Sequence, residues 1–160
     1  MEKIEGIPEI SALTLKNLGD KSYDRRKCSA EEITAVFAKY YNEGNEDKTK
    51  KILGVMQTDF LRSPNVNYRN GALVTISSIA FFLDTNAVKY FPIILNPVLK
   101  CLEDSDSKVR YYSSEALYNI AKAARTGVIS YFDRFFYALC YLFSDVDTDV
   151  KKISFAVLLP

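Results

Sequence analysis

The sequence repeats itself with a period of about 41 residues. Residues 104–110 read DSDSKVR, and residues 145–151 read DVDTDVK, 41 positions later. The same offset carries Tyr90 to Tyr131 and, going back along the chain, Arg110 to Arg69; a further step of 43 residues reaches Arg26. Four segments therefore share one pattern. Such a chain is expected to bury its core between successive copies of one unit, which excludes most single-core folds.

Each unit carries the hydrophobic spacing of α-helices. Between residues 107 and 125 the small and apolar residues fall at steps of three and four, which places them on one helical face: Val109, Tyr112, Ser113, Ala116, Leu117, Ile120, Ala121 and Ala124. The alternation typical of strands is absent from the sequence. Turn and capping residues then divide the chain into expected helices at about 20–41, 46–61, 66–83, 87–103, 107–125, 128–143 and 147–159.

Helix pairs with a period of about 40–47 residues are typical of HEAT and armadillo repeats. The sequence therefore predicts an all-α, right-handed α-solenoid of about three and a half helix pairs. We expect one domain over residues 1–160, with repeats at roughly 1–43, 44–84, 85–126 and 127–160. The chain ends in FAVLLP without a polar cap, so we expect either a longer parent scaffold or self-association through Phe155, Val157, Leu158 and Leu159.

Charge and hydropathy limit the partners. Lys plus Arg (21) nearly equals Asp plus Glu (20), so there is no overall electrostatic attraction to nucleic acid. A basic cluster that would dock on a membrane is absent, as are a signal-like start and an apolar run of about 18 residues. These features predict a cytoplasmic protein. Three widely spaced cysteines, Cys28, Cys101 and Cys140, are expected to be core residues in a reducing compartment.

Catalytic residues are missing from the sequence. It contains no histidine, the usual general base at neutral pH, and its six glycines form no phosphate-binding loop. The cysteines match no metal or redox motif. We therefore expect a protein that is not an enzyme and that uses no cofactor and no metal.

Charged residues recur where one repeat meets the next. Acid pairs precede two helices and are expected to cap them rather than to hold Ca²⁺: Asp104 with Asp106, and Asp145 with Asp147. Basic residues follow at equivalent positions: Arg69, Arg110 and Lys151. They could form an anion site along a groove. The favoured interpretation is a structural ladder in which each base bonds the acid or amide of the preceding turn, because acid and base recur together.

One helix carries a second set of polar and aromatic residues. Tyr111, Glu115, Tyr118 and Lys122 lie at i, i+4, i+7 and i+11, away from the apolar face, and Asn119 lies beside them. Outward tyrosines are stiff, amphipathic interface anchors, so these five residues are the candidate partner-binding site. The alternative is that the rings merely cover neighbouring helices.

Several strings resemble a known family. They are PVLKCLEDSD at residues 97–106, VRYYSSEALYNIAK at 109–122, YFD at 131–133 and FYALC at 136–140. KSYDRRK at 21–27 and RNGAL at 69–73 fit its earlier repeats. Together they resemble the amino-terminal HEAT region of the family of vacuole morphology and inheritance protein fourteen. Members of that family are several times longer, and their carboxyl-terminal half has no counterpart here.

The resemblance implies a non-catalytic scaffold. Such a scaffold holds a phosphatidylinositol 3-phosphate 5-kinase and an opposing lipid phosphatase, and so supports phosphatidylinositol 3,5-bisphosphate synthesis. Its association with endosomal or vacuolar membranes would be indirect, through the complex. We expect the kinase to bind a groove on the third and fourth repeats. The rival interpretation is a HEAT adaptor of another sort, similar to a transport receptor or a phosphatase scaffold.

Overall fold

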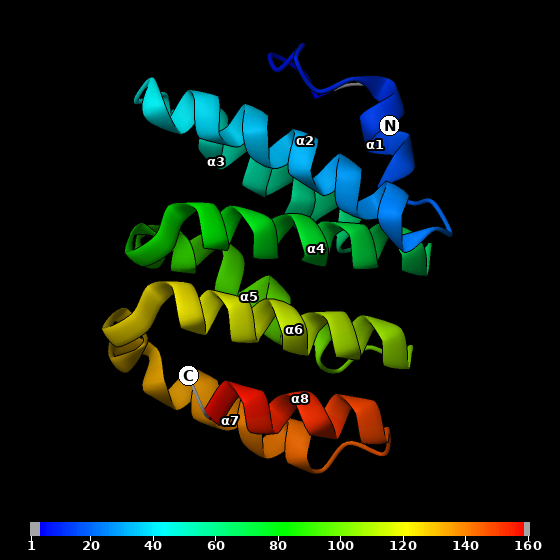
Figure 1. Ribbon diagram of the computed structural model, residues 1–160, viewed down its shortest axis with the longest axis vertical. Helices are drawn as coiled ribbons and strands as arrows, with labels where there is room; N and C mark the ends of the chain where they lie inside the picture. Colours follow the sequence, from blue (N-terminus) through cyan, green and yellow to red (C-terminus); the bar gives the residue numbers. More distant parts are fainter. Residues whose placement is uncertain (1–3, 159–160) are drawn as a thin grey trace.

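The computed structural model describes residues 4–158, with side chains through residue 153, and every regular element in that range is helical (Figure 1). The longer helices match the expected ones. Some expected helices begin with a 3₁₀ segment or end with a π-helical one. In chain order the helices are α1 (Ala12–Asn17), α2 (Tyr23–Asn42), α3 (Glu46–Val55), η1 (Met56–Phe60), α4 (Val66–Leu83), η2 (Asp84–Tyr90), α5 (Phe91–Cys101), α6 (Ser107–Ala124), η3 (Arg125–Tyr131), α7 (Phe132–Phe143) and α8 (Thr148–Leu158).

The helices stack in two rows, as Figure 1 shows. The front row is α2, α4, α6 and α8, each packed on the next, and the back row is α3, α5 and α7. Each repeat thus adds one front and one back helix to the stack. This arrangement confirms the predicted all-α solenoid. The repeat boundaries at residues 43, 84 and 126 stay a prediction.

The front helices begin where the sequence places capping oxygens. Asp106 Oδ1 accepts hydrogen bonds from the backbone N–H groups of Lys108 (2.9 Å) and Val109 (3.3 Å) at the start of α6. Asn65 Oδ1 accepts from Asn67 N at 2.9 Å at the start of α4. These bonds satisfy amide donors that have no partner within the helix. Local polar residues therefore set the register of the front row.

The core is a stripe repeated along the front row. Leu117 of α6 is fully buried, and so are its repeat equivalents Ile76 of α4 and Ile33 of α2. Fully burying one such aliphatic side chain contributes about 1.5–3 kcal/mol. The face predicted from the spacing of apolar residues is therefore the buried face.

Non-glycine residues end two front helices, against expectation. The sequence predicts that Gly127 ends α6 in a left-handed conformation, but the helix ends at Arg125 with φ 50° and ψ −125°, and α4 ends in the same way at Asp84 with φ 49° and ψ −135°. Gly127 serves close packing instead, because a Cβ on it would lie 2.3 Å from Val88 Cγ2. The chain thus turns two residues earlier than predicted, and the next turn of helix is the 3₁₀ segment η3.

The amino-terminal segment covers the first repeat, which the sequence did not predict. Helix α1 is short, and Ile7, Ile10, Leu15 and Leu18 around it are fully or almost fully buried. Gly71 of α4 lets this segment approach, since a Cβ there would lie 2.2 Å from the Leu18 carbonyl oxygen. The amino-terminal end of the stack is therefore sealed.

One stretch is apolar enough to suggest a membrane span, where the sequence predicted none. Val66–Cys101 passes on length and composition. The structure instead breaks it at Asp84 and folds it into front helix α4 and back helix α5, with half of the most apolar window buried. Its hydrophobicity therefore serves the centre of the stack, because α4 is packed between α2 and α6.

Only one cysteine is a core residue. Cys101 is buried, and this burial raises the pKa of its thiol to about 11. Cys28 and Cys140 are exposed, so the expectation that all three lie in the core is wrong for these two. Cys28 lies between the buried residues Arg26 and Ser29 of α2 but points away from the buried face.

Helix α7 and the preceding segment η3 expose an apolar face, although the equivalent positions in the preceding repeat are covered. Exposed apolar side chains occur at Ile129 of η3 and at Phe132, Phe136 and Phe143 of α7, whereas the residues 41 positions earlier are buried or, for Val88, half-buried: Val88, Phe91, Leu95 and Leu102. The ring of Tyr131, for example, lies edge-on to Phe91 with centroids 4.9 Å apart. The predicted edge at residues 155–159 lies outside the described side chains.

Candidate protein-binding groove

A long groove runs across the front row. It has a volume of about 780 Å³ and lies between α2, α4 and α6, so it belongs to the first three expected repeats and not to the third and fourth, where the binding groove was predicted. Its walls combine large rings with small aliphatic and hydroxyl side chains, among them Tyr23, Leu73, Ser77, Phe81, Tyr112 and Asn119. Because the front helices are nearly parallel and regularly spaced (Figure 1), the groove is open and elongated rather than enclosed.

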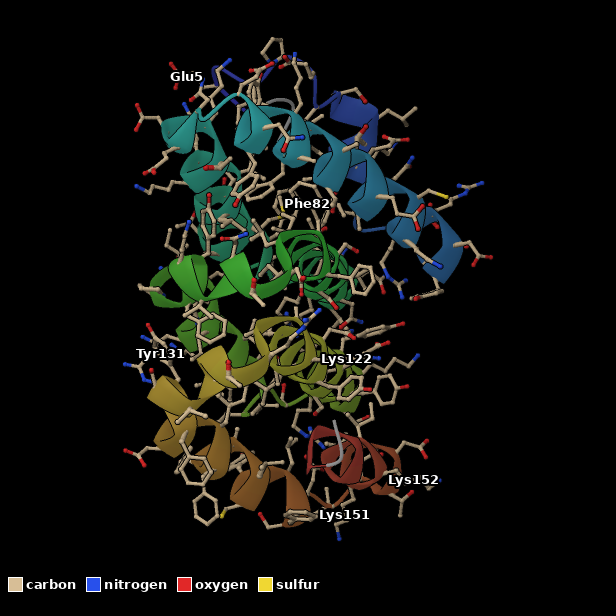
Figure 2. The ribbon with its side chains drawn as sticks, turned by 60° about the vertical axis from the view of Figure 1, so that its left-hand side comes forward. Glu5, Phe82, Lys122, Tyr131, Lys151 and Lys152 are labelled. Carbon is tan, nitrogen blue, oxygen red and sulfur yellow. The ribbon has the colours of Figure 1, made fainter. Side chains whose placement is uncertain are left out.

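Phenylalanines occupy one end of the groove. Phe81, on the last turn of α4, is 74% exposed. Phe82 packs edge-on against Tyr41 of α2, with ring centroids 5.7 Å apart, and Figure 2 shows it between the two front helices. An exposed ring as large as Phe81 beside an apolar wall is a candidate binding anchor.

Tyrosines and one buried arginine form the other end. Tyr23 of α2 stacks on Tyr112 of α6, with centroids 6.2 Å apart and planes 13° from parallel. Arg26 Nη2 donates a hydrogen bond to the Tyr112 hydroxyl at 3.2 Å. Its guanidinium carbon also lies 5.9 Å and 5.7 Å from the centres of the two rings. These contacts join α2 to α6 past α4 and fix the width of the groove.

Arginines and aspartates couple neighbouring repeats, as geometry shows directly. Arg110 Nε donates to Asp145 Oδ2 at 2.8 Å, and Nη2 donates to Oδ1 at 3.0 Å. Arg69 Nη2 donates to Asp104 Oδ1 at 3.2 Å, while its Nε lies 2.9 Å from Oδ2 outside hydrogen-bonding alignment. Each arginine thus reaches the acid of the following turn, 35 residues ahead, and not of the preceding turn as predicted.

The preceding turn contributes carbonyl groups to the same arginines. Arg110 Nη1 donates to the Asp104 carbonyl at 2.9 Å, and Arg69 Nη1 donates to the Ser63 carbonyl at 2.7 Å. Arg26 makes the matching bond to the Asp20 carbonyl at 2.9 Å. The prediction failed because each arginine lies on the first turn of a front helix. Its Nη1 bonds backbone carbonyls of the loop just before that helix, and its other nitrogens reach the aspartate in the loop of the next repeat.

The other predicted acids and Lys151 lie in the same junctions. Asp106 caps α6, and Asp147 Oδ1 accepts from Asp149 N at 2.9 Å at the start of α8. The pKa of Asp145 is lowered, chiefly by the hydrogen bond from Arg110 and in small part by the charge of Lys151. These charges serve the junctions between repeats and line a different part of the surface from the groove.

The five predicted partner residues divide between two places. Glu115 and Asn119 line the groove, and Asn119 Nδ2 donates to Ser77 Oγ at 2.7 Å. Tyr111 and Tyr118 are half-buried, and Tyr111 packs against the core, so their role in partner binding stays a prediction. Lys122 is exposed, lies 5.6 Å from the Tyr118 ring centre and appears on the front-row side in Figure 2, opposite Tyr131.

Glu115 is the one groove acid that is withdrawn from water. It is half-buried, and desolvation raises the pKa of its carboxyl group. Within the described residues it has no hydrogen bond and no ion pair. Its charge is felt by two rings beside it: the pKa values of Tyr23 and Tyr111 are raised by burial first and by Glu115 second.

Sequence patterns missed four groove residues: Tyr23, Phe81, Phe82 and Tyr112. Tyr112 was assigned to the buried stripe, and it is half-buried at the groove instead. The adjacent pair Phe81-Phe82 carried a usable signal. Neighbouring residues on a helix point about 100° apart, so two large rings in sequence cannot both face a narrow core stripe.

The fold and the groove together define a helical-repeat interaction module. Among the described residues no cluster of three metal-ligating side chains occurs. Solved structures with this architecture include computationally designed armadillo repeat proteins for modular peptide recognition (TM-score 0.60, 23% identical, 92% of this chain and 63% of that chain). A second designed armadillo repeat protein has a TM-score of 0.59 at 22% identity, with the same shares covered. At these identities the likeness supports the fold alone.

Sequence comparison places the module in a family. Residues 67–158 match the family described as the Vacuolar 14 Fab1-binding region, and the chain belongs to this family. The VAC14 homolog of Arabidopsis thaliana is 37% identical over 92% of this chain, and that of Schizosaccharomyces pombe is 38% identical over 88%. Vacuole morphology and inheritance protein 14 of Saccharomyces cerevisiae is 36% identical over 85%. The chain spans 20%, 18% and 16% of these relatives' lengths.

Proposed function

We propose that this chain is a non-catalytic scaffold segment that binds the Fab1-type phosphatidylinositol 3-phosphate 5-kinase through its front-row groove. The observation that carries the proposal is an overlap. The matched Fab1-binding region, residues 67–158, contains α4 and α6, which form two of the three walls of the groove. By supporting that kinase, the segment would contribute to phosphatidylinositol 3,5-bisphosphate synthesis. It would reach vacuolar or endosomal membranes through the complex.

The composition of the groove supports protein binding. Solenoids bind partners along extended surfaces, where a few aromatic anchors supply most of the binding energy. Phe81 is such an anchor, because it is well exposed and its loss would leave the packed stripe of α4 intact. Tyr23 and Tyr112 add rings at the other end of the groove.

The test is co-purification of the kinase with the Phe81→Ser variant. Losing a dominant anchor costs about 2 kcal/mol, or roughly thirtyfold in affinity. The matched control is Leu13→Ser, which removes an apolar side chain that is 64% exposed on α1, outside both the groove and the matched region. We expect loss of kinase with the first variant only. Equal kinase recovery from both variants, each with a normal helical spectrum, would place the contact elsewhere.

We propose in addition that copies of this chain associate through the exposed face of α7. In the preceding repeat the same positions are covered by a neighbouring helix, so this face has the shape and chemistry of a stacking surface. Binding of the opposing lipid phosphatase is part of the same scaffold proposal and rests on the family resemblance. A generic adaptor role would be favoured if the intact groove fails to recover the kinase.

A further inference from the structure

The position of Glu115 specifies what kind of partner the groove accepts. Its carboxylate sits in a largely apolar groove, half-buried, without a hydrogen bond or ion pair in the described part of the chain. A carboxylate in such a place carries a desolvation cost that a cation can offset. Tyr23 and Tyr112 also line the groove, and the guanidinium carbon of Arg26 already lies 5.9 Å and 5.7 Å from their ring centres, so this end of the groove accepts a cation beside aromatic rings.

The remaining groove charges do not neutralise Glu115. Glu31, on the opposite wall, already faces Lys27 at 4.0 Å in an exposed i,i+4 pair. Arg26 is 5% exposed and is occupied by backbone carbonyls and the Tyr112 hydroxyl. No basic side chain contributes to the shift in the pKa of Glu115, which comes from burial alone. Among the described residues, Glu115 therefore presents a negative charge to the groove that no basic side chain pairs with.

Apolar contacts surround this charge. Ala116 of α6 and Leu73 of α4 are buried beneath the groove, and Val74 of α4 is partly exposed in it. Toward the end of α4 the same groove reaches Phe81. A partner that places a positive side chain at Glu115 would thus lay its neighbouring side chains on hydrocarbon.

We propose that the groove binds a partner segment in which a basic side chain, arginine or lysine, is flanked by apolar side chains. The basic group pairs with Glu115, and the apolar groups pack along α4 toward Phe81. This inference rests on the proposed function, because the kinase is the protein expected to carry the segment. It adds the chemistry that recognises that segment.

The test uses two labelled peptides and measures affinity by fluorescence anisotropy. One peptide alternates arginine with leucine, and the other replaces every arginine with glutamine. We expect the arginine peptide to bind the unmodified chain at least about tenfold more tightly, which corresponds to about 1.4 kcal/mol. In Glu115→Gln this difference should fall to less than about twofold. The control Glu103→Gln, which removes an exposed carboxylate outside the groove, should keep it.

A second measurement guards against a folding defect in the variant. In the unmodified chain, the NMR-detected pKa of the Glu115 carboxyl should fall when the arginine peptide binds and should stay raised with the glutamine peptide. A preference for arginine that survives Glu115→Gln would overturn the inference, as would an unmoved pKa. If Phe81→Ser loses the kinase while Glu115→Gln retains it in full, the kinase-binding proposal stands and the basic-segment inference falls.

Discussion

The pair of Arg110 and Asp145 should be one of the strongest single contributions to stacking of the last described repeats. The arginine side chain is 12% exposed and the aspartate side chain 3% exposed, so both charges are largely removed from water. Two hydrogen bonds of 2.8 Å and 3.0 Å join them. Asp145 Oδ1 also accepts from Asp147 N at 2.8 Å, which ties the loop before α8 to α6.

Asp145→Asn tests this contact with almost no change in shape. The amide keeps one acceptor oxygen and has an NH2 donor in place of the other. That donor faces the guanidinium, and the largely buried charge of Arg110 is left without its counter-ion. Breaking a buried pair from one side costs about 3–5 kcal/mol. Because Arg110 keeps its carbonyl partner at Asp104, we expect the lower end, about 3 kcal/mol. For a chain of this size that lowers Tm by about 6–12 °C.

The assay is urea and thermal unfolding followed by circular dichroism at 222 nm. Asp149→Asn is the matched control, because it also removes a carboxylate at the same junction but from an exposed pair, with Asp149 69% exposed and 3.0 Å from Lys152. Such pairs contribute about 0–1 kcal/mol. If the two variants lose equal stability, to within about 0.5 kcal/mol, the reasoning about the buried pair is refuted.

The same pair has a defined pH dependence. The hydrogen bond from Arg110 lowers the pKa of Asp145 in the folded state below the unfolded value, which is about 3.9. The stabilisation is therefore fully present above that pH and is lost as the pH falls from there through the folded pKa. The stability difference between the unmodified chain and Asp145→Asn should be constant near neutrality and shrink in acid. A difference that grows in acid would contradict the assignment.

Two further predictions concern the core and the α7 face. Leu117→Ala, at a fully buried site, should lower the free energy of unfolding by about 2–5 kcal/mol. Tyr111→Ala, at a half-buried site, should lower it by less than half as much. Equal losses of Tm would show that the face assignment is wrong. The double variant Phe132→Ser with Phe136→Ser should weaken self-association in sedimentation velocity, because both rings are more than half exposed and stack on each other at 5.7 Å. An unmodified chain that stays monomeric at high concentration would contradict the second.

Much of the fold could be predicted because its signals are local. The expected helix 66–83 coincides with α4, and the helix expected at 107–125 is one residue longer than α6. Capping oxygens and apolar steps of three and four act within one or two turns. The turns at Asp84 and Arg125 could not be predicted, because non-glycine residues rarely combine a φ near 50° with a ψ of −135° or −125°.

The candidate site was predicted only in part. Glu115 and Asn119 were chosen from the helix that does line the groove, but their companions Tyr111 and Tyr118 were expected to face solvent and are half-buried. The exposure of a side chain on a front helix depends on the helix stacked beside it. Spacing along one helix identifies a face, but it does not say how closely the next helix covers it.

The sequence by itself determined the repeat, the helical class, the capping of the front helices and the acids and bases that meet at each junction. All of these follow from residue types at short, fixed separations. Only the tertiary structure decided the groove, since Arg26 and Tyr112, 86 residues apart, meet through the spacing of α2 and α6 on either side of α4. It also decided which carboxylate each arginine reaches, and it left Glu115 half-buried without a counter-ion among the described residues. Those outcomes depend on the distances between stacked helices, which arise from packing of the whole stack and are not encoded in any single helix.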